Sequence, residues 1–318
     1  MIKLPTPPQF AGAFYKRLSR IACSSLMLLA LAAPLPAVGM LYVSLQDNTI
    51  VSYDTSSGVA ATIAASKATF ASTNLANPQG LAFDTSGNLY AANYDPTNST
   101  ISKFNASGGY VSNISSNLSG TLALALDTSD NLYAANVINN TISKFNSAGT
   151  FLSQINSNLN TPVGLAFDSS GNLYAANDTN NTISKFNSSG TFLSQINSNL
   201  SNPYGLAFDS TGNLYAANYT SSTISKFNSA GTFLSQINSN LNNPVGLAFD
   251  SSGNLYAAND TNRTISKFSS SGTFLTSWST GTAIPTYIAF KPVTVPEPAS
   301  TLFCGLGFLA ALFRRRRH

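Results

Sequence analysis

The chain has 318 residues, of which only 9% are charged, and Ser, Thr, Asn and Gly fill most of its polar positions. Its formal charge of +4 would favour a nucleic-acid partner if the basic residues formed a patch on the fold. Eight of them instead flank apolar runs at the two chain ends, which carry +7 together with Glu297 and leave −3 in the middle. The composition therefore excludes a basic nucleic-acid binder and predicts a neutral, polar surface.

The first 39 residues have the pattern of a secretory signal. Three basic residues precede an apolar run at residues 21–33, and the small residues of LPAVG follow it. This order of basic, apolar and small segments is typical of an export signal that is removed, with Ala37 or Gly39 as the cleavage position. We therefore predict a signal peptide over residues 1–39, and a buried core helix is the alternative.

Between residues 40 and 292 the chain repeats one unit about every 41 residues. The sequence GLAFDSSGNLYAAN occupies residues 164–177 and 246–259, and its copy at 205–218 differs only at Thr211. The aspartate of GLAFD recurs at spacings of 43, 41, 41 and 41, and the variant TYIAFK places Lys291 another 41 residues on. These positions predict six inner strands, and the five aspartates are Asp84, Asp127, Asp168, Asp209 and Asp250.

Each unit contains four short runs rich in β-forming residues. In the unit that begins at Gly164, GLAFD is followed by NLYAAN, TISKFN and TFLSQI. The segments DSSGN and NSSGT join these runs, and their Asp, Asn, Ser and Gly favour tight hairpins. Because no 10-residue stretch has helical spacing, helical repeats of similar period are excluded. Four antiparallel strands per 41 residues are typical of a β-propeller blade.

The two ends of the repeat array supply complementary parts of one further blade. Residues 41–54 align with the second and third strands of a unit, yet no inner strand precedes them, while the last unit supplies only an inner strand at Tyr287 to Phe290. Pairing these ends removes exposed sheet edges. We therefore predict an all-β, six-bladed β-propeller of four-stranded antiparallel blades over residues 40–292. A C-terminal inner strand should close it by pairing with the N-terminal strands.

The consensus PxGLAFDSSGNLYAANxxNNTISKFNSSGTFL resembles the NHL repeat of β-propellers over roughly residues 41–292. In one unit the matching positions are Pro162, Gly164, Asp168, Gly171, Asn172, Tyr174, Ile183, Phe186 and Gly190. The unit departs from the family around its second turn, where many NHL repeats have an aspartate and a basic residue and this chain mostly has Asn177 and Thr182. The resemblance implies the propeller fold, and the departure predicts that amides and hydroxyls replace charges.

Residues 293–318 form three consecutive parts: VPEPAS at 295–300, an apolar run at 301–313, and RRRRH. This order resembles the PEP-CTERM sorting signal of exported bacterial proteins, and the matching residues are Pro296, Glu297, Pro298, Arg314, Arg315, Arg316 and Arg317. Thirteen residues in a helix reach about 20 Å, short of a roughly 30 Å hydrocarbon core, although snorkelling arginines extend the reach. The resemblance implies transient anchoring in the inner membrane, tail removal by an exosortase-type protease, and delivery to the cell surface or extracellular matrix. A plain C-terminal transmembrane helix is the alternative.

The residue types that catalysis needs are scarce in the repeat region. The single histidine is His318, the single glutamate is Glu297, and the cysteines are Cys23 and Cys304, so all of them lie outside residues 40–292. General acid-base catalysis, soft-metal sites and nucleophilic triads depend on such groups. We therefore expect no catalytic residue, no cofactor, no metal and no disulfide. The GLAFD aspartates are expected to form turns, because each loop has one carboxylate where calcium sites collect several.

Two positions vary among the otherwise near-identical units. One follows LYAAN or its counterpart and is occupied in turn by Gln46, Tyr94, Val137, Asp178, Tyr219 and Asp260. The other follows the proline before the inner strand and is occupied by Gln79, Val163, Tyr204, Val245 and Thr286. In a propeller both loops emerge on one face around the channel mouth. Either ligand recognition or neutral drift in exposed loops accounts for such variation.

Asparagines at the end of each LYAAN run are expected to form a ring of amides beside tyrosines on this face. Such a surface suits sugars or neutral peptide, whereas nucleic acid requires cations. The candidate ligand-binding residues are Tyr94, Tyr204, Tyr219, Asp178, Asp260, Asn93, Asn177, Asn218 and Asn259, and Asn136 completes the ring. The repeated lysines are expected to be solvated on the blade flanks: Lys103, Lys144, Lys185, Lys226 and Lys267. The repeated tyrosines are expected to pack between blades: Tyr90, Tyr133, Tyr174, Tyr215 and Tyr256.

These features predict an exported, noncatalytic binding or structural protein of the bacterial cell surface or extracellular matrix. It would contact polysaccharide or protein through the loop face, where several weak and similar contacts add up. The alternative is a secreted lactonase- or lyase-like propeller enzyme that uses channel aspartates and a divalent metal. Membrane contact is expected only through the signal and sorting segments, and no nucleic-acid partner is expected.

Overall fold

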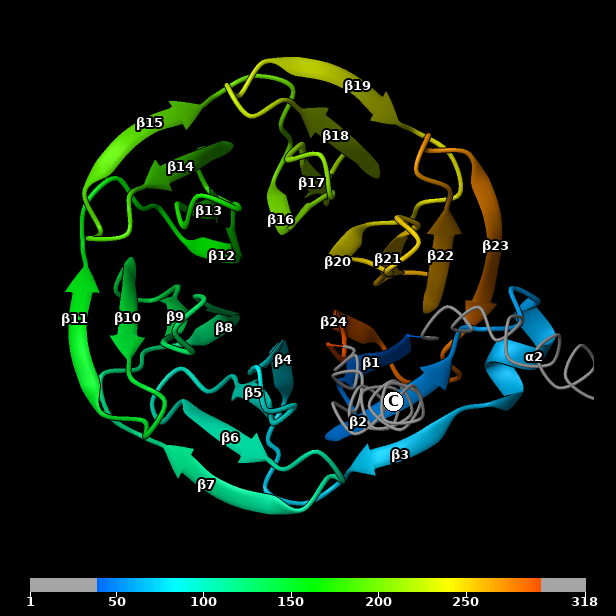
Figure 1. The fold of residues 1–318 in the computed structure, drawn as a ribbon, viewed down its shortest axis with the longest axis horizontal. Coiled ribbons are helices and arrows are strands. Elements are labelled where there is room, and N and C mark those ends of the chain that lie inside the picture. The colour runs from blue at the N-terminus through cyan, green and yellow to red at the C-terminus, as the bar shows by residue number, and fades with distance from the viewer. Residues whose placement is uncertain (1–38, 293–318) are drawn as a thin grey trace, which may run out of the picture. The chain divides into compact units, whose positions relative to one another are not determined.

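The computed structural model describes residues 39–292, in which 24 β-strands form six four-stranded sheets arranged as blades around one axis (Figure 1). Every pairing within these sheets is antiparallel, and in one of them Leu41 lies opposite Tyr53. The predicted six-bladed β-propeller is therefore confirmed. The predicted signal peptide, apart from Gly39, and the predicted sorting signal from residue 293 lie outside the described residues.

Each blade runs from an inner strand beside the axis to an outer strand at the perimeter (Figure 1). Blade 1 contains β24 Pro285–Phe290, β1 Met40–Leu45, β2 Thr49–Asp54 and β3 Ala68–Ala71. Blade 2 contains β4 Pro78–Phe83, β5 Leu89–Asn93, β6 Thr100–Phe104 and β7 Tyr110–Ile114. Blade 3 contains β8 Thr121–Leu126, β9 Leu132–Asn136, β10 Thr141–Phe145 and β11 Phe151–Ile155.

The remaining three blades follow the same order. Blade 4 contains β12 Pro162–Phe167, β13 Leu173–Asn177, β14 Thr182–Phe186 and β15 Phe192–Ile196. Blade 5 contains β16 Pro203–Phe208, β17 Leu214–Asn218, β18 Thr223–Phe227 and β19 Phe233–Ile237. Blade 6 contains β20 Pro244–Phe249, β21 Leu255–Asn259, β22 Thr264–Phe268 and β23 Phe274–Ser279.

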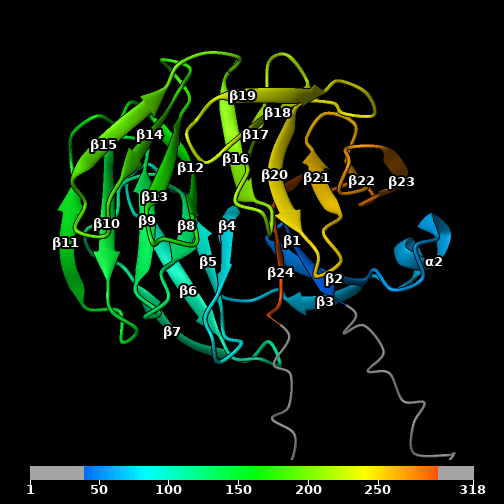
Figure 2. The same ribbon diagram turned by 45° about the horizontal axis from the view of Figure 1, so that its top comes forward.

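Blade 1 closes the ring in the predicted way. Its inner strand β24 comes from the end of the array and pairs with β1 from the beginning, so that Leu41 lies opposite Phe290 and Val43 opposite Ile288. The two strands lie side by side in Figures 1 and 2. Because β1 would otherwise present an open edge, this pairing joins both ends of the array in one sheet.

One helix was not predicted. Between β2 and β3, where the other blades have a tight hairpin, residues Ala60–Ala65 form α2. Its sequence AATIAA is rich in alanine, the residue with the highest helix propensity. Ile63 is fully buried in a core cluster with Tyr53 and Trp278. The helix therefore covers the outer part of the junction between blades 1 and 6.

The repeated tyrosines pack between blades, as predicted. Tyr90 lies in a core cluster with Leu124 and Leu132 of blade 3, whose inner strand ends in a leucine. The other four, and a tyrosine at the same position of blade 1, meet edge to face the phenylalanine that ends the next blade's inner strand. Ring centroids are 4.9–5.0 Å apart in the pairs Tyr42–Phe83, Tyr133–Phe167, Tyr174–Phe208, Tyr215–Phe249 and Tyr256–Phe290. Such pairs add to the burial of apolar area, and the last of them spans the closure.

The repeated lysines are not solvated on the blade flanks, so that prediction was wrong. In blades 2 to 6 the lysine Nζ lies 3.4–3.7 Å from the GLAFD aspartate of its own blade. It also lies 4.8–5.1 Å from the ring centre of the repeated tyrosine. The lysine side chains are only 10–23% exposed. Each full repeat therefore keeps a pair of opposite charges. Blade 1 alone among the six lacks the pair, because it has Ser52 at the lysine position and Lys291 at the aspartate position.

The GLAFD aspartates form turns, as predicted. Asp168 Oδ1 accepts hydrogen bonds from the backbone N–H groups of Ser170 and Asn172, each at 2.9 Å. Its Oδ2 accepts a third bond, of 2.8 Å, from Asn172 Nδ2. Gly171 completes the turn with a φ of 78°, a conformation that glycine adopts without strain.

These turns predict loss of stability in acid. Burial alone would raise the pKa of Asp209, but hydrogen bonds from Asn213 and Thr211 outweigh it and lower the pKa to about 2. The pKa values of Asp127 and Asp168 are lowered by the same balance. A carboxylate whose pKa falls on folding stabilises the fold above its unfolded pKa of about 4, and this contribution is lost as the pH falls through the folded value.

We therefore expect the melting temperature to fall by several degrees between about pH 4 and pH 2, since about 1 kcal/mol shifts it by roughly 2–4 °C in a domain of this size. Thermal unfolding followed by circular dichroism at a series of pH values checks this. The Asp209→Asn variant should show a shallower dependence. An unchanged melting temperature across that range would contradict the expectation.

Candidate functional site

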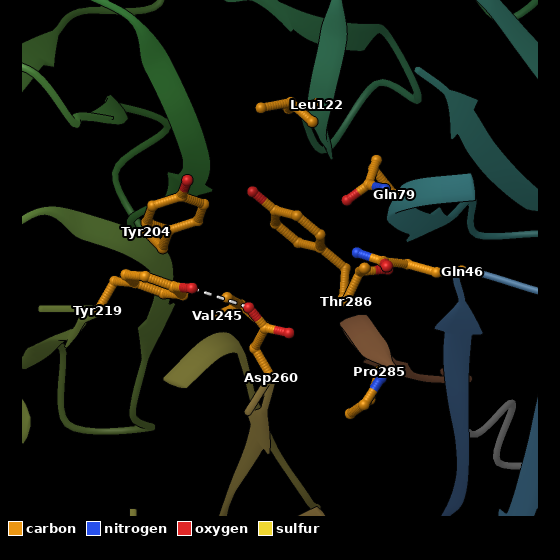
Figure 3. A pocket seen from close by; sticks show the side chains of 10 residues that line it. Gln46, Gln79, Leu122, Tyr204, Tyr219, Val245, Asp260, Pro285 and Thr286 are labelled. Carbon is orange, nitrogen blue, oxygen red and sulfur yellow. Dashed lines mark hydrogen bonds between the residues drawn. The ribbon is translucent and has the colours of Figure 1, made fainter. Parts of the chain in front are cut away.

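The two variable positions of the repeat meet at one end of the axis. Ten residues line a cavity of about 150 Å³ there (Figure 3). Eight of them occupy the variable positions: Gln46, Tyr219 and Asp260 after second strands, and Gln79, Leu122, Tyr204, Val245 and Thr286 at the start of inner strands. The other two are Pro285 and Tyr287. The residues that differ between blades are thus the ones that the fold gathers.

Strand register explains this gathering. In blade 5, Pro203 at the start of the inner strand lies opposite Asn218 at the end of the second strand, so the residues that follow each, Tyr204 and Tyr219, emerge together. A bulge between Pro203 and Leu206 frees the intervening residues from the ladder. The next inner strand passes so closely that a Cβ at Gly205 would lie 2.4 Å from the Val245 carbonyl oxygen.

Tyr287 interrupts the ring of small residues that this close approach requires. The same position is occupied by Gly80, Ala123, Gly164, Gly205 and Gly246 in the other blades. The Tyr287 hydroxyl donates a hydrogen bond to the carbonyl oxygen of Val163 in β12. Because blade 4 lies across the axis from blade 1 in Figure 1, this side chain spans the channel. Burial raises the pKa of Tyr287, so its hydroxyl stays protonated as a donor.

Tyr204, Tyr219 and Asp260 are the predicted site residues that the cavity brings together. The two tyrosine rings are tilted by 35°, with centroids 5.3 Å apart. The Tyr219 hydroxyl donates a 2.9 Å hydrogen bond to Asp260 Oδ2 (Figure 3). Burial raises the pKa of Tyr204 to about 12, with a contribution from the nearby carboxylates. Burial and the bond to Asp260 also raise the pKa of Tyr219, so both rings are neutral.

Tyr94 and Asp178 do not line this cavity. Asp178 Oδ1 accepts a 2.6 Å hydrogen bond from Asn202 Nδ2, which ties the loop of blade 4 to the entry of blade 5. Tyr94 is partly buried in blade 2, where its backbone N–H donates to the Asn77 carbonyl oxygen at 3.2 Å. Both residues occupy the same repeat position as Asp260, but the loops that follow the second strands of blades 2 and 4 do not contribute to the lining.

The asparagines predicted to face a ligand are instead inside the blades, 0–3% exposed: Asn93, Asn136, Asn177, Asn218 and Asn259. In blade 4, Asn177 Nδ2 donates to Thr182 Oγ1 at 3.1 Å and to Ser184 Oγ at 3.0 Å. Its Oδ1 accepts a 3.1 Å bond from the Asn160 backbone N–H. The other four asparagines repeat this pattern. Since both amide ends have partners within the blade, the amides hold the scaffold together.

The repeat pattern did not point to Tyr287, Gln79 or Thr286 as site residues, although Gln79 and Thr286 occupy a variable position. The available signal for Tyr287 was a tyrosine in a column otherwise filled by glycine and alanine. Within residues 39–292, no three His, Cys, Asp or Glu side chains are grouped so that they could hold a metal ion. No helix in that range has the length and apolarity to cross a membrane. The predicted transmembrane segment at 301–313 lies outside it.

The C-terminal segment matches a known family model. The model of the PEP-CTERM protein-sorting motif matches residues 294–317. The chain carries a PEP-CTERM sorting signal. This signal indicates export and membrane-linked sorting, and it implies processing by exosortase-like machinery.

The propeller of this PEP-CTERM protein resembles solved structures at low sequence identity. A nidogen/laminin complex matches with a TM-score of 0.68 and 18% identity, over 80% of this chain and 99% of that chain. A protein of unknown function from Bacteroides caccae matches with a TM-score of 0.63 and 13% identity, over 81% and 100%. Virginiamycin B lyase from Staphylococcus aureus matches with a TM-score of 0.56 and 16% identity, over 66% and 73%. These likenesses show the fold alone, and no curated protein matches the sequence.

Proposed function

We propose that this PEP-CTERM propeller is a noncatalytic binding protein of the bacterial cell surface or extracellular matrix, and that its loop face contacts polysaccharide. The observation that carries the proposal is the cavity at the channel mouth. Eight of its ten lining residues occupy the two positions that vary between blades, while most other repeat positions are nearly identical in the full units. The scaffold is thus nearly constant, and the residues that it presents around the cavity differ from blade to blade.

The chemistry of the cavity supports a sugar ligand. The rings of Tyr204 and Tyr219 offer apolar faces, and the carboxylate of Asp260 and the amides of Gln46 and Gln79 offer hydrogen bonds. No lysine or arginine lines the cavity, which disfavours phosphate and nucleic acid. Additional weak contacts on neighbouring loops would add avidity toward a repetitive polymer. A protein surface is the second ligand class that this chemistry accommodates.

The low-identity likeness to lyases motivates the enzyme alternative. One lyase structure, described as a catalytically inactive variant with quinupristin bound, has a histidine replaced by alanine. The single histidine of this chain is His318, which lies outside the described residues. An enzyme would therefore rely on aspartates such as Asp178 and Asp260. Metal analysis of the purified protein, combined with the Asp178→Asn, Asp260→Asn double variant, distinguishes the two functions, because loss of a turnover activity in that variant would contradict a binding role.

A binding screen tests the proposal directly. The protein comprising residues 40–292, which contains all six blades, would be presented to a panel of exopolysaccharides and glycans. Tyr219→Ala should weaken retention about tenfold, since it removes a ring from the cavity and the partner of Asp260. Tyr94→Ala is the matched control and should have little effect, because Tyr94 does not line the cavity. The proposal would be contradicted if the protein bound none of the exopolysaccharides and glycans, or if Tyr219→Ala and Tyr94→Ala weakened binding equally.

A further inference from the structure

The cavity contains one negatively charged group and no positively charged one. Asp260 is the one charged residue among the ten that line it. Tyr219 donates to one oxygen of this carboxylate, and the other oxygen is turned toward the cavity in Figure 3. The basic residue of the same loop, Arg263, is exposed and does not line the cavity. The site therefore attracts a group that carries positive charge and hydrogen-bond donors.

A second acceptor faces the first across the cavity. Gln79 is 8% exposed, and its Nε2 donates a 2.9 Å hydrogen bond to Asn77 Oδ1. With the amide nitrogen held in this way, the carbonyl oxygen of Gln79 points into the cavity (Figure 3). The neutral rings of Tyr204 and Tyr219 also line the cavity, and the face of an aromatic ring attracts a cation.

The size of the cavity limits its occupant to one small group. A volume of about 150 Å³ is below the roughly 300–1,000 Å³ of pockets for drug-sized ligands. Tyr287 spans the channel by bonding to Val163 and also lines the cavity, so no long side chain can extend down the axis. A ligand must therefore present its cationic group close to an apolar surface that packs on the tyrosines.

We propose that the cavity binds the primary ammonium group of an amino sugar, so that the polymer recognised is a polysaccharide with free amino groups. This inference rests on the proposed function and names its substrate class. In a glucosamine unit the ammonium is attached directly to the ring, beside the apolar C–H face. Asp260 and the ring of Tyr219, joined by their hydrogen bond, would contact both parts at once. A lysine ammonium, which follows four methylene groups, fits a shallow cavity less well.

The test uses two oligosaccharides of equal length. Calorimetric titration of residues 40–292 with a glucosamine tetramer and an N-acetylglucosamine tetramer, near pH 6, compares a charged and a neutral form of the same backbone. We expect the amino form to bind at least about tenfold more tightly. Asp260→Asn should abolish this preference, because it removes the charge and keeps the shape. Asp95→Asn removes a carboxylate from an equivalent loop outside the cavity and should leave the preference intact.

The outcomes separate this inference from the function on which it rests. Equal affinity for the two tetramers, or an unchanged preference in Asp260→Asn, would overturn the ammonium site while leaving polysaccharide binding in place. Binding of a lysine-rich peptide that depends on Asp260, without binding of the glucosamine tetramer, would overturn it in favour of a protein partner. If no glycan of any kind is retained, the proposed function fails as well.

Discussion

A chain that ends at residue 284 should lose the cooperative propeller fold. Without β24, blade 1 has no inner strand, and β1 becomes an open edge beside the channel. Ile288, which is 5% exposed, and Phe290, the partner of Tyr256, leave the core. Since burial of each large apolar side chain contributes about 1.5–3 kcal/mol, these losses together with the ladder hydrogen bonds approach the 5–15 kcal/mol that stabilises a typical domain.

Thermal unfolding and size-exclusion chromatography of residues 40–284 measure this effect, with residues 40–292 as the control. The control should unfold in one cooperative transition and elute as a single species. The shortened chain should show no such transition at any temperature and should aggregate through its open strand edge. If it instead melts cooperatively within a few degrees of the control, blade 1 does not depend on β24 and the ring is not stabilised by its closure.

The closure could be predicted because it depends on strand order alone. Residues 41–54 lack a preceding inner strand and the last unit lacks everything after one, so the missing parts are complementary. Local patterns also predicted each repeated strand, since every run is short and bounded by turn residues. The helix α2 was missed because six residues are too few for a helical period to show in the sequence.

Side-chain surroundings were predicted less well, and for a physical reason. An asparagine at a strand end has the same appearance in a sequence whether it faces a ligand or a neighbouring strand. Asn177 proved to be buried because the loop at residues 158–161 folds back over it. Lys185 is only 21% exposed because the hairpin of its own blade supplies Asp168 as its partner. Loop positions of this kind are set by tertiary structure.

The most informative feature of the sequence was whether a residue is the same in every blade or differs between blades. Residues that are the same in every full repeat, such as Asn177, stabilise the scaffold, and residues that differ, such as Tyr219 and Asp260, line the cavity. Variation between blades thus pointed to Tyr204, Tyr219 and Asp260, which line the cavity, and also to Tyr94 and Asp178, which do not. Chemical suitability alone pointed to the asparagines, which are buried in the blades.

Asn177→Leu should be strongly destabilising. The substitution removes both donors to Thr182 and Ser184 and the acceptor for the Asn160 backbone N–H. Each buried polar group that loses its partner costs about 1–3 kcal/mol, so we expect a loss of about 3–5 kcal/mol in the free energy of unfolding. Chemical denaturation measures it, and Asn197→Leu, an exposed asparagine in the same blade, is the matched control.

Blade 1 has an apolar pair at the positions that the asparagine and serine occupy in the other blades. Leu45 and Val51 stand where the other blades have the asparagine and its serine partner, and both are buried in an apolar cluster. The double variant Asn177→Leu, Ser184→Val should therefore recover part of the lost stability, because an apolar pair replaces a half-broken polar one. Such recovery appears as a favourable coupling energy between the two substitutions. An additive result would mean that the asparagine is not held through Ser184. If Asn177→Leu alone left the free energy of unfolding unchanged, the asparagines would not be structural, and they would again be candidates for ligand contact.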